Sequence, residues 1–135
     1  MSIKAATPYL FFDGRATDAM DAYKEALGAE VTSLQRFGDM DESCPEAMRD
    51  RVMHASLQVG EALLFVSDGP DGIPSESGNV SVALDLDDPD AARRQFQALA
   101  AAGTIIEDLF EAPWGALFGV VEDEFGISWM FNCPL

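Results

Sequence analysis

Short runs of apolar side chains alternate along the chain with two stretches in which apolar residues recur at helical spacing. In the first half this pattern predicts a strand at 6–12, a helix at 15–27, a strand at 29–37 and a hairpin of strands at 51–59 and 62–67. Gly28 is the expected stop of the helix. The polar residues 38–45 predict a loop before the hairpin.

The second half repeats this order after a segment rich in glycine and proline, residues 68–78, which predicts a linker. Asp88 is the expected N-cap and Pro89 the first residue of a helix at 89–102, which Gly103 ends. Further strands are predicted at 79–86, 104–109, 115–121 and 127–132. The repeat indicates one α+β domain over residues 1–135, with half-modules of about 1–68 and 79–135.

The charge balance is strongly acidic, with 24 Asp and Glu against 8 Lys and Arg and a net charge of −16. Such a surface repels phosphate backbones and anionic lipids, so neither nucleic acid nor a membrane is expected as a partner. Cys44 and Cys133 lack the spacing of a metal or redox site, which favours free thiols and the cytoplasm. No apolar run reaches the roughly 20 residues of a membrane span, and no signal peptide is expected.

Several stretches carry a pattern more specific than periodicity: Thr7 to Gly14 (TPYLFFDG), Tyr23 to Val31 (YKEALGAEV), Val52 to Leu57 (VMHASL), and Trp114 to Met130, which holds Trp-Gly-x-x-x-Gly and Phe-Gly-x-x-Trp-Met. In this order they resemble the PhnB-like branch of the vicinal-oxygen-chelate superfamily (glyoxalase, bleomycin resistance protein, extradiol dioxygenase). The resemblance implies two βαβββ modules that form a cupped, incomplete barrel with helices outside, and a homodimer. Members include metal-dependent enzymes and metal-free drug-sequestering proteins, so the fold alone leaves the function open.

Some PhnB-like proteins carry a 3-demethylubiquinone methyltransferase label. No glycine-rich loop follows the first predicted strand, so the sequence does not favour a nucleotide-type methyl donor.

The metal positions of the superfamily, placed by aligning the strands, fall at Thr7, Phe65, Ser81 and Met130. None is a carboxylate or imidazole, the donors that a catalytic divalent ion needs, so no metal and no other cofactor is expected. A shift of one or two residues brings in Tyr9, Asp68, Asn79 and Asn132 instead, and among these only Asp68 is a usual ligand.

His54 is the only histidine, and strand alternation places it on a face with Ser56 and Gln58. It is either a general base or ligand contact, or a hydrogen-bonded strand histidine, and the pattern leaves both interpretations open. If it is catalytic, the alternative function is a metal-dependent lyase or dioxygenase of the glyoxalase type, with a rearranged site near His54 and Asp68.

Alternation also predicts an aromatic lining for the cup with a few hydroxyl and amide groups, which is typical of a site for a small organic ligand. The expected ligand-binding residues are Tyr9, His54, Phe65, Ser67, Ser81, Trp114, Met130 and Asn132. Trp129 is expected in the core. The leading hypothesis is a metal-free protein that binds a small molecule. The aromatics could instead fill the cup as ordinary core. An enzyme, or a structural or interaction role in which dimerisation matters and the cavity is vestigial, also stays open, and no catalytic residue is assigned.

Overall fold

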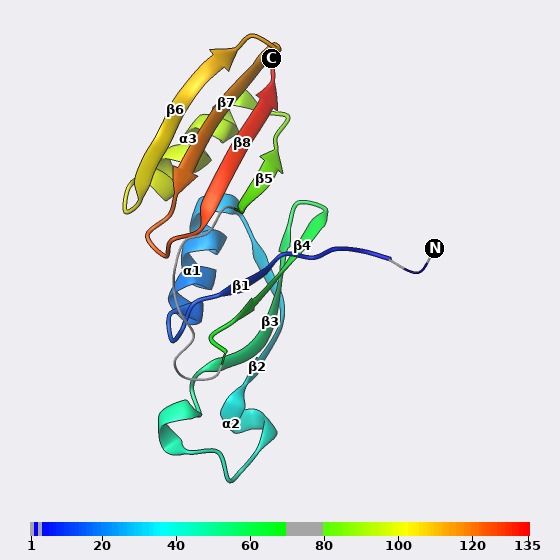
Figure 1. Ribbon diagram of the computed structural model, residues 1–135, viewed down its shortest axis with the longest axis vertical. Helices are drawn as coiled ribbons and strands as arrows, with labels where there is room; N and C mark the ends of the chain where they lie inside the picture. The colour runs from blue at the N-terminus through cyan, green and yellow to red at the C-terminus, as the bar shows by residue number, and fades with distance from the viewer. Residues whose placement is uncertain (1, 3, 70–79) are drawn as a thin grey trace. The chain divides into compact units, whose positions relative to one another are not determined.

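The computed structural model describes residues 2, 4–69 and 80–135, and the chain divides into two compact units. The N-terminal unit spans Met1–Ser75 and the C-terminal unit Glu76–Leu135. Each contains a four-stranded mixed sheet and one long helix (Figure 1). From residue 70 onward, the predicted linker at 68–78 lies outside the described residues.

The sheet of the N-terminal unit has the order β1-β4-β3-β2, in which β1 is parallel to β4 and the other pairs are antiparallel. Its elements are β1 (Tyr9–Phe11), α1 (Ala16–Leu27), β2 (Glu30–Arg36), β3 (Val52–Val59) and β4 (Ala62–Ser67). Helix α1 contacts β3 and ends at Gly28, whose φ of 70° is left-handed. The predicted glycine stop is confirmed, because glycine adopts this conformation without a steric penalty.

The predicted loop after β2 is wrong in part, since it contains the short helix α2 (Phe37–Met40) and a 3-10 turn, η1 (Glu46–Met48). The Asp39 carboxylate accepts a hydrogen bond from the Arg36 N–H at 3.1 Å and closes the first turn of α2. This turn depends on a local side-chain contact and buries no residue. It therefore leaves no apolar period in the sequence.

The C-terminal unit repeats the arrangement, with the sheet order β5-β8-β7-β6 and β5 parallel to β8. Its elements are β5 (Ser81–Asp85), α3 (Pro89–Ala100), β6 (Thr104–Ala112), β7 (Ala116–Glu122) and β8 (Ser128–Pro134). The predicted cap of α3 is confirmed, because the Asp88 carboxylate accepts hydrogen bonds from the N–H groups of Asp90 and Ala91 at 3.0 and 3.4 Å. The α+β class and the βαβββ order of both halves are thus confirmed.

Each sheet is buried on one face by its helix. In the C-terminal unit Trp129, Phe96 and Phe131 are fully buried, and the rings of Phe96 and Phe131 meet edge to face at 5.3 Å. The predicted core position of Trp129 is confirmed, and its indole N–H donates to the Asp123 carboxylate at 2.8 Å. Alternate strand residues point to the other side of each sheet, which we call the open face, and Figure 1 shows α3 behind the sheet with this face toward the viewer. Within the described ranges, no helix is long and apolar enough to cross a membrane.

The two thiols differ in environment, since Cys44 is partly exposed whereas Cys133 is buried. Burial, together with the carboxylates of Asp87 and Asp88, raises the pKa of the Cys133 thiol. We expect native protein at pH 8 to react with iodoacetamide at Cys44 only, because the thiolate is the reactive form. Mass spectrometry checks this, with urea-unfolded protein, labelled at both cysteines, as the control. Equal labelling of both thiols in native protein would contradict it.

Candidate functional site

The open face of the N-terminal unit carries a cluster of aromatic side chains on β1 and β4. Tyr9 lies directly opposite Phe65 in the register, and their rings meet edge to face at 5.7 Å. The rings of Tyr9 and Phe11 stack in parallel at 4.8 Å. Tyr9 and Phe11 are 41% and 45% exposed, so these rings offer apolar surface instead of filling a core.

His54 belongs to the same cluster. Its Nδ1 atom lies 2.9 Å from the Tyr9 hydroxyl, and its ring centroid lies 4.9 Å from that of Phe65. The prediction that His54 faces away from the helix-covered core is confirmed, because its neighbour Ala55 is fully buried while His54 is partly exposed. The imidazole is therefore both a hydrogen-bonded strand residue and an accessible polar group beside the Tyr9 and Phe65 rings.

Ser67, which we expected to line the site, is 3% exposed. Its hydroxyl donates to the Met53 carbonyl at 2.8 Å and accepts from the Gly69 N–H at 2.8 Å. The hydroxyl therefore holds the end of β4 against β3, and a ligand would have to displace these bonds to reach it.

Asp68 is 2% exposed, and its carboxylate binds the backbone instead of facing His54. Oδ1 accepts from the N–H groups of Gly14 and Ala16 at 2.7 and 2.8 Å, and Oδ2 accepts from the Val52 N–H at 2.8 Å. These donors lie in the turn before α1, at the first residue of α1 and at the first residue of β3. The Asp68 carboxylate therefore serves the first turn of α1 and the start of β3, whereas the alternative function, with a rearranged metal site near His54 and Asp68, requires it as a metal ligand.

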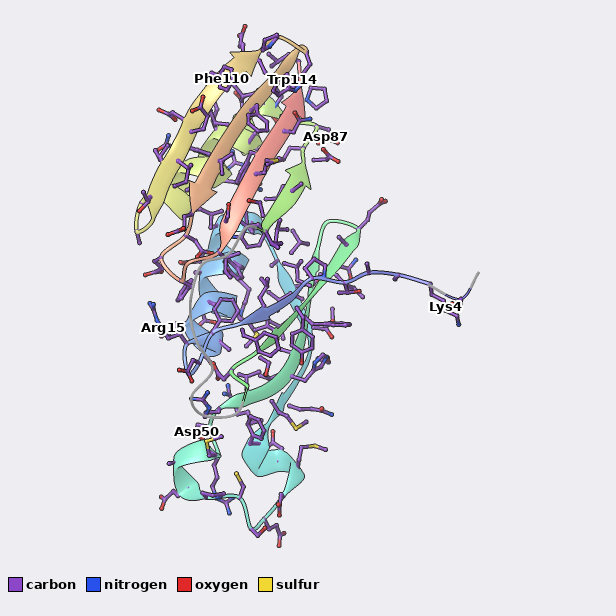
Figure 2. All side chains as sticks on the ribbon, viewed as in Figure 1. Lys4, Arg15, Asp50, Asp87, Phe110 and Trp114 are labelled. Carbon is purple, nitrogen blue, oxygen red and sulfur yellow. The ribbon has the colours of Figure 1, made fainter. Side chains whose placement is uncertain are left out.

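The open face of the C-terminal unit is organised in rows that run across the strands. One row, which we call the aromatic row, crosses all four strands as Asp85, Asn132, Phe118 and Phe110, each directly opposite the next. Trp114, in the turn between β6 and β7, joins this row: its indole N–H donates to Asn132 Oδ1 at 3.0 Å, and its ring meets Phe118 edge to face at 5.3 Å. Figure 2 shows Phe110 and Trp114 at the same end of the sheet.

Two further rows complete this face. Met130 lies between Ala83 and Val120 in an apolar row. Ser128 lies between Ser81 and Glu122 in a polar row, and the Ser81 and Ser128 hydroxyl oxygens are 2.6 Å apart. The structure therefore brings Ser81, Trp114, Met130 and Asn132 to one face of one sheet, as the sequence predicted for the last strand and for Ser81.

Sequence reasoning missed Phe110 and Phe118. Phe118 alternates with the buried Leu117, so the period of β7 contained the signal that would have found it. Phe110 carried no such signal, because the register of β6 against β7 shifts between Ile105 and Glu107 and again before Phe110. These irregularities interrupt the two-residue period on which the reasoning depends.

The side chains at the superfamily's metal positions can be tested against the strand register. Tyr9, not Thr7, lies opposite Phe65, while Ala83 lies opposite Met130 and Ser128 opposite Ser81. In either register these positions offer hydroxyl, thioether and hydrocarbon groups, without a carboxylate, imidazole or thiolate. Across residues 4–69 and 80–135 no three His, Cys, Asp or Glu side chains gather as ion ligands. The residues present do not fit a catalytic divalent ion.

Two βαβββ units, each with exposed aromatic side chains on the open face of its sheet, define a two-module α+β protein. The whole-chain comparison agrees, since the family model of the Glyoxalase/Bleomycin resistance protein/Dioxygenase superfamily matches residues 6–131. The chain belongs to this superfamily.

Relatives of similar length support the assignment. Protein YjdN of Escherichia coli strain K12 is 35% identical over 137 residues, which cover 93% of this chain and 92% of the relative. The crystal structure of protein PA1353 from Pseudomonas aeruginosa is 35% identical, with a TM-score of 0.85 and 98% of each chain covered. A putative 3-demethylubiquinone-9 3-methyltransferase, PhnB protein, from Bacillus cereus shares the fold at 24% identity, with a TM-score of 0.80 over 96% of this chain and 99% of that one.

Proposed function

We propose that this protein binds a small organic molecule through the aromatic side chains of its open faces, without the divalent metal of the superfamily's enzymes. The observation that carries this proposal is the exposure of large rings on regular strands and their turn, where Tyr9, Phe11, Phe110 and Trp114 are 40–61% exposed. Exposed apolar surface gathered in one place is a feature of binding sites.

The hydrogen-bonding side chains that contact the rings are held in place, as a site that orients a small ligand requires. The Tyr9 hydroxyl restrains the His54 imidazole, and the Trp114 indole restrains the Asn132 amide. The two faces therefore offer the same combination of flat apolar contact and one positioned hydrogen-bonding group. Aromatic side chains lose little conformational entropy when a ligand packs on them, because each has two side-chain torsions.

The chemistry of the donors favours binding over metal-dependent catalysis. A lyase or dioxygenase of the glyoxalase type needs a metal with protein ligands and open positions, and the residues at the expected positions do not supply those ligands. The methyltransferase name of the Bacillus cereus protein finds no support in this chain either, since no glycine-rich loop follows β1.

We also propose a homodimer, because strands at the sheet edges present backbone groups that a second copy can pair.

The proposal predicts that an uncharged aromatic probe, quinoline, binds at the two faces. Quinoline added to ¹⁵N-labelled protein should shift the Trp114 indole signal and amides of β4 and β8. Phe65→Ala and Trp114→Ala should each weaken quinoline binding at their own face about tenfold, since loss of one ring contact costs up to about 1.4 kcal/mol. Excess EDTA should leave the affinity unchanged.

Leu34→Ala is the matched control for these truncations. Leu34 is 41% exposed but lies opposite Ala55, on the other face of the same sheet from His54. Its removal should not change quinoline binding. Loss of binding on addition of EDTA, or the same affinity in Phe65→Ala, Trp114→Ala and the parent protein, would refute the proposal.

A further inference from the structure

We propose that the aromatic row of the C-terminal unit, with Trp114, is a site for a planar organic cation, bound by its flat face and by its positive charge. This inference rests on the proposed function and narrows it to one class of ligand and one of the two open faces. It draws on three features of the row: the arrangement of the rings, the carboxylate at its end and the charge of the surrounding unit.

The rings of the row are arranged to present both faces and edges to a ligand. Trp114 and Phe110 meet Phe118 at interplanar angles of 76° and 89°, so Phe118 lies between two rings nearly perpendicular to its own. Trp114 is 61% exposed and Phe110 is 40% exposed. The face of an aromatic ring carries negative partial charge, which attracts a cation placed over it, and tryptophan does so most strongly.

Asp85 supplies a formal negative charge at the β5 end of the row. It is exposed, and it lies directly opposite Asn132, whose amide oxygen already accepts the Trp114 indole N–H. None of the described residues forms an ion pair with Asp85. A ligand that lies on Trp114 and Phe118 therefore meets an unpaired carboxylate one strand beyond Asn132.

The charge of the C-terminal unit favours the same sign of ligand. Its sequence, residues 76–135, contains only two basic side chains, Arg93 and Arg94, and both are exposed on α3. Helix α3 packs through Ala92 and Phe96 on the face of the sheet opposite the aromatic row. Since Glu107 and Glu122 add to Asp85 on the open face, an anion is repelled there and a cation is attracted.

Three probes with the same ring system separate charge from shape. We would titrate the protein by calorimetry at pH 7.5 with 1-methylquinolinium, a permanent cation, with quinoline, which is uncharged, and with quinoline-4-carboxylate, an anion. The cation should bind about five- to tenfold more tightly than quinoline, and the anion more weakly than either, from the cation–π and charge contributions together. Raising the salt from 20 to 500 mM should reduce this preference, because exposed charges are screened.

Three variants locate the effect. Asp85→Asn should bring the affinity for 1-methylquinolinium down toward that for quinoline and leave quinoline itself unchanged. Glu111→Gln is the matched control: it removes the same charge next to Phe110 but lies opposite the buried Leu117, on the helix side, so the preference should persist. Trp114→Ala should weaken the binding of both probes.

The outcomes separate the two proposals. If quinoline binds and is sensitive to Trp114→Ala but the cation binds no better, the cation site is refuted while the proposed function stands. If Asp85→Asn leaves the preference for the cation unchanged, the Asp85 carboxylate does not attract the ligand, and the cation site at the aromatic row is refuted. If none of the three probes binds, both proposals fail.

Discussion

Replacement of Asp68 by alanine should lower the free energy of unfolding by about 3–5 kcal/mol, since each buried N–H group left without its acceptor costs about 1–3 kcal/mol. The carboxylate accepts from three backbone N–H groups, at Gly14, Ala16 and Val52, and is 2% exposed. Alanine leaves these donors without their acceptor, at the point where the first turn of α1 meets the start of β3. The loss should appear in urea unfolding as a lower midpoint with an unchanged slope.

Asp13→Asn is the matched control for this experiment. Asp13 lies in the turn before α1, next to Gly14, and forms an ion pair with Arg51 at 2.8 Å, but its side chain is 34% exposed. Asparagine also tolerates the left-handed φ of 46° at this position. Loss of a partly exposed ion pair should cost less than about 1 kcal/mol. Equal midpoints for Asp68→Ala and the parent protein would show that water replaces the carboxylate without cost.

Gly103→Ala should cost about 3 kcal/mol or more, as a substitution that forces the backbone apart. A Cβ atom at this position would lie 2.2 Å from the Glu122 carbonyl oxygen, 2.9 Å from the Leu99 carbonyl oxygen and 3.0 Å from the Asp123 Cα atom. All three are backbone atoms, so no side-chain rotation relieves the clash. Thermal unfolding followed by circular dichroism measures the loss.

Gly28→Ala separates this clash from the ordinary cost of replacing a glycine after a helix. At Gly28 a Cβ atom would meet nothing within 4 Å, but φ is 70°. Only the left-handed backbone is then penalised, by about 1 kcal/mol. If Gly103→Ala proved no more destabilising than Gly28→Ala, the result would contradict the inferred clash between a Cβ atom at residue 103 and the backbone of the β7–β8 turn.

Much of this fold followed from the sequence because the signals are local. On β3 the alternation of buried Ala55 and Leu57 with the more exposed His54 and Ser56 needs only a two-residue period against one covered face. The Asp88-Pro89 start of α3 likewise depends on hydrogen bonds within one turn. The same two- and 3.6-residue apolar periods predicted the βαβββ order in each half of the chain. They also predicted that most of the candidate binding residues lie on the strand face opposite the helix.

Tertiary structure alone decided which residues meet, because strand register and close backbone approach join positions far apart in the chain. No pattern in the sequence brings the Asp68 carboxylate to the Gly14, Ala16 and Val52 amides, 16 to 54 residues away. The pairing of Trp114 with Asn132 depends in the same way on how β7 and β8 align. Gly28 and Gly103 look alike in the sequence as glycines after a helix, yet one provides a left-handed turn and the other leaves room for a neighbouring backbone. The sequence placed a glycine at or shortly after the end of each helix. The left-handed backbone explains Gly28 locally, whereas only the close approach of the β7–β8 turn explains Gly103.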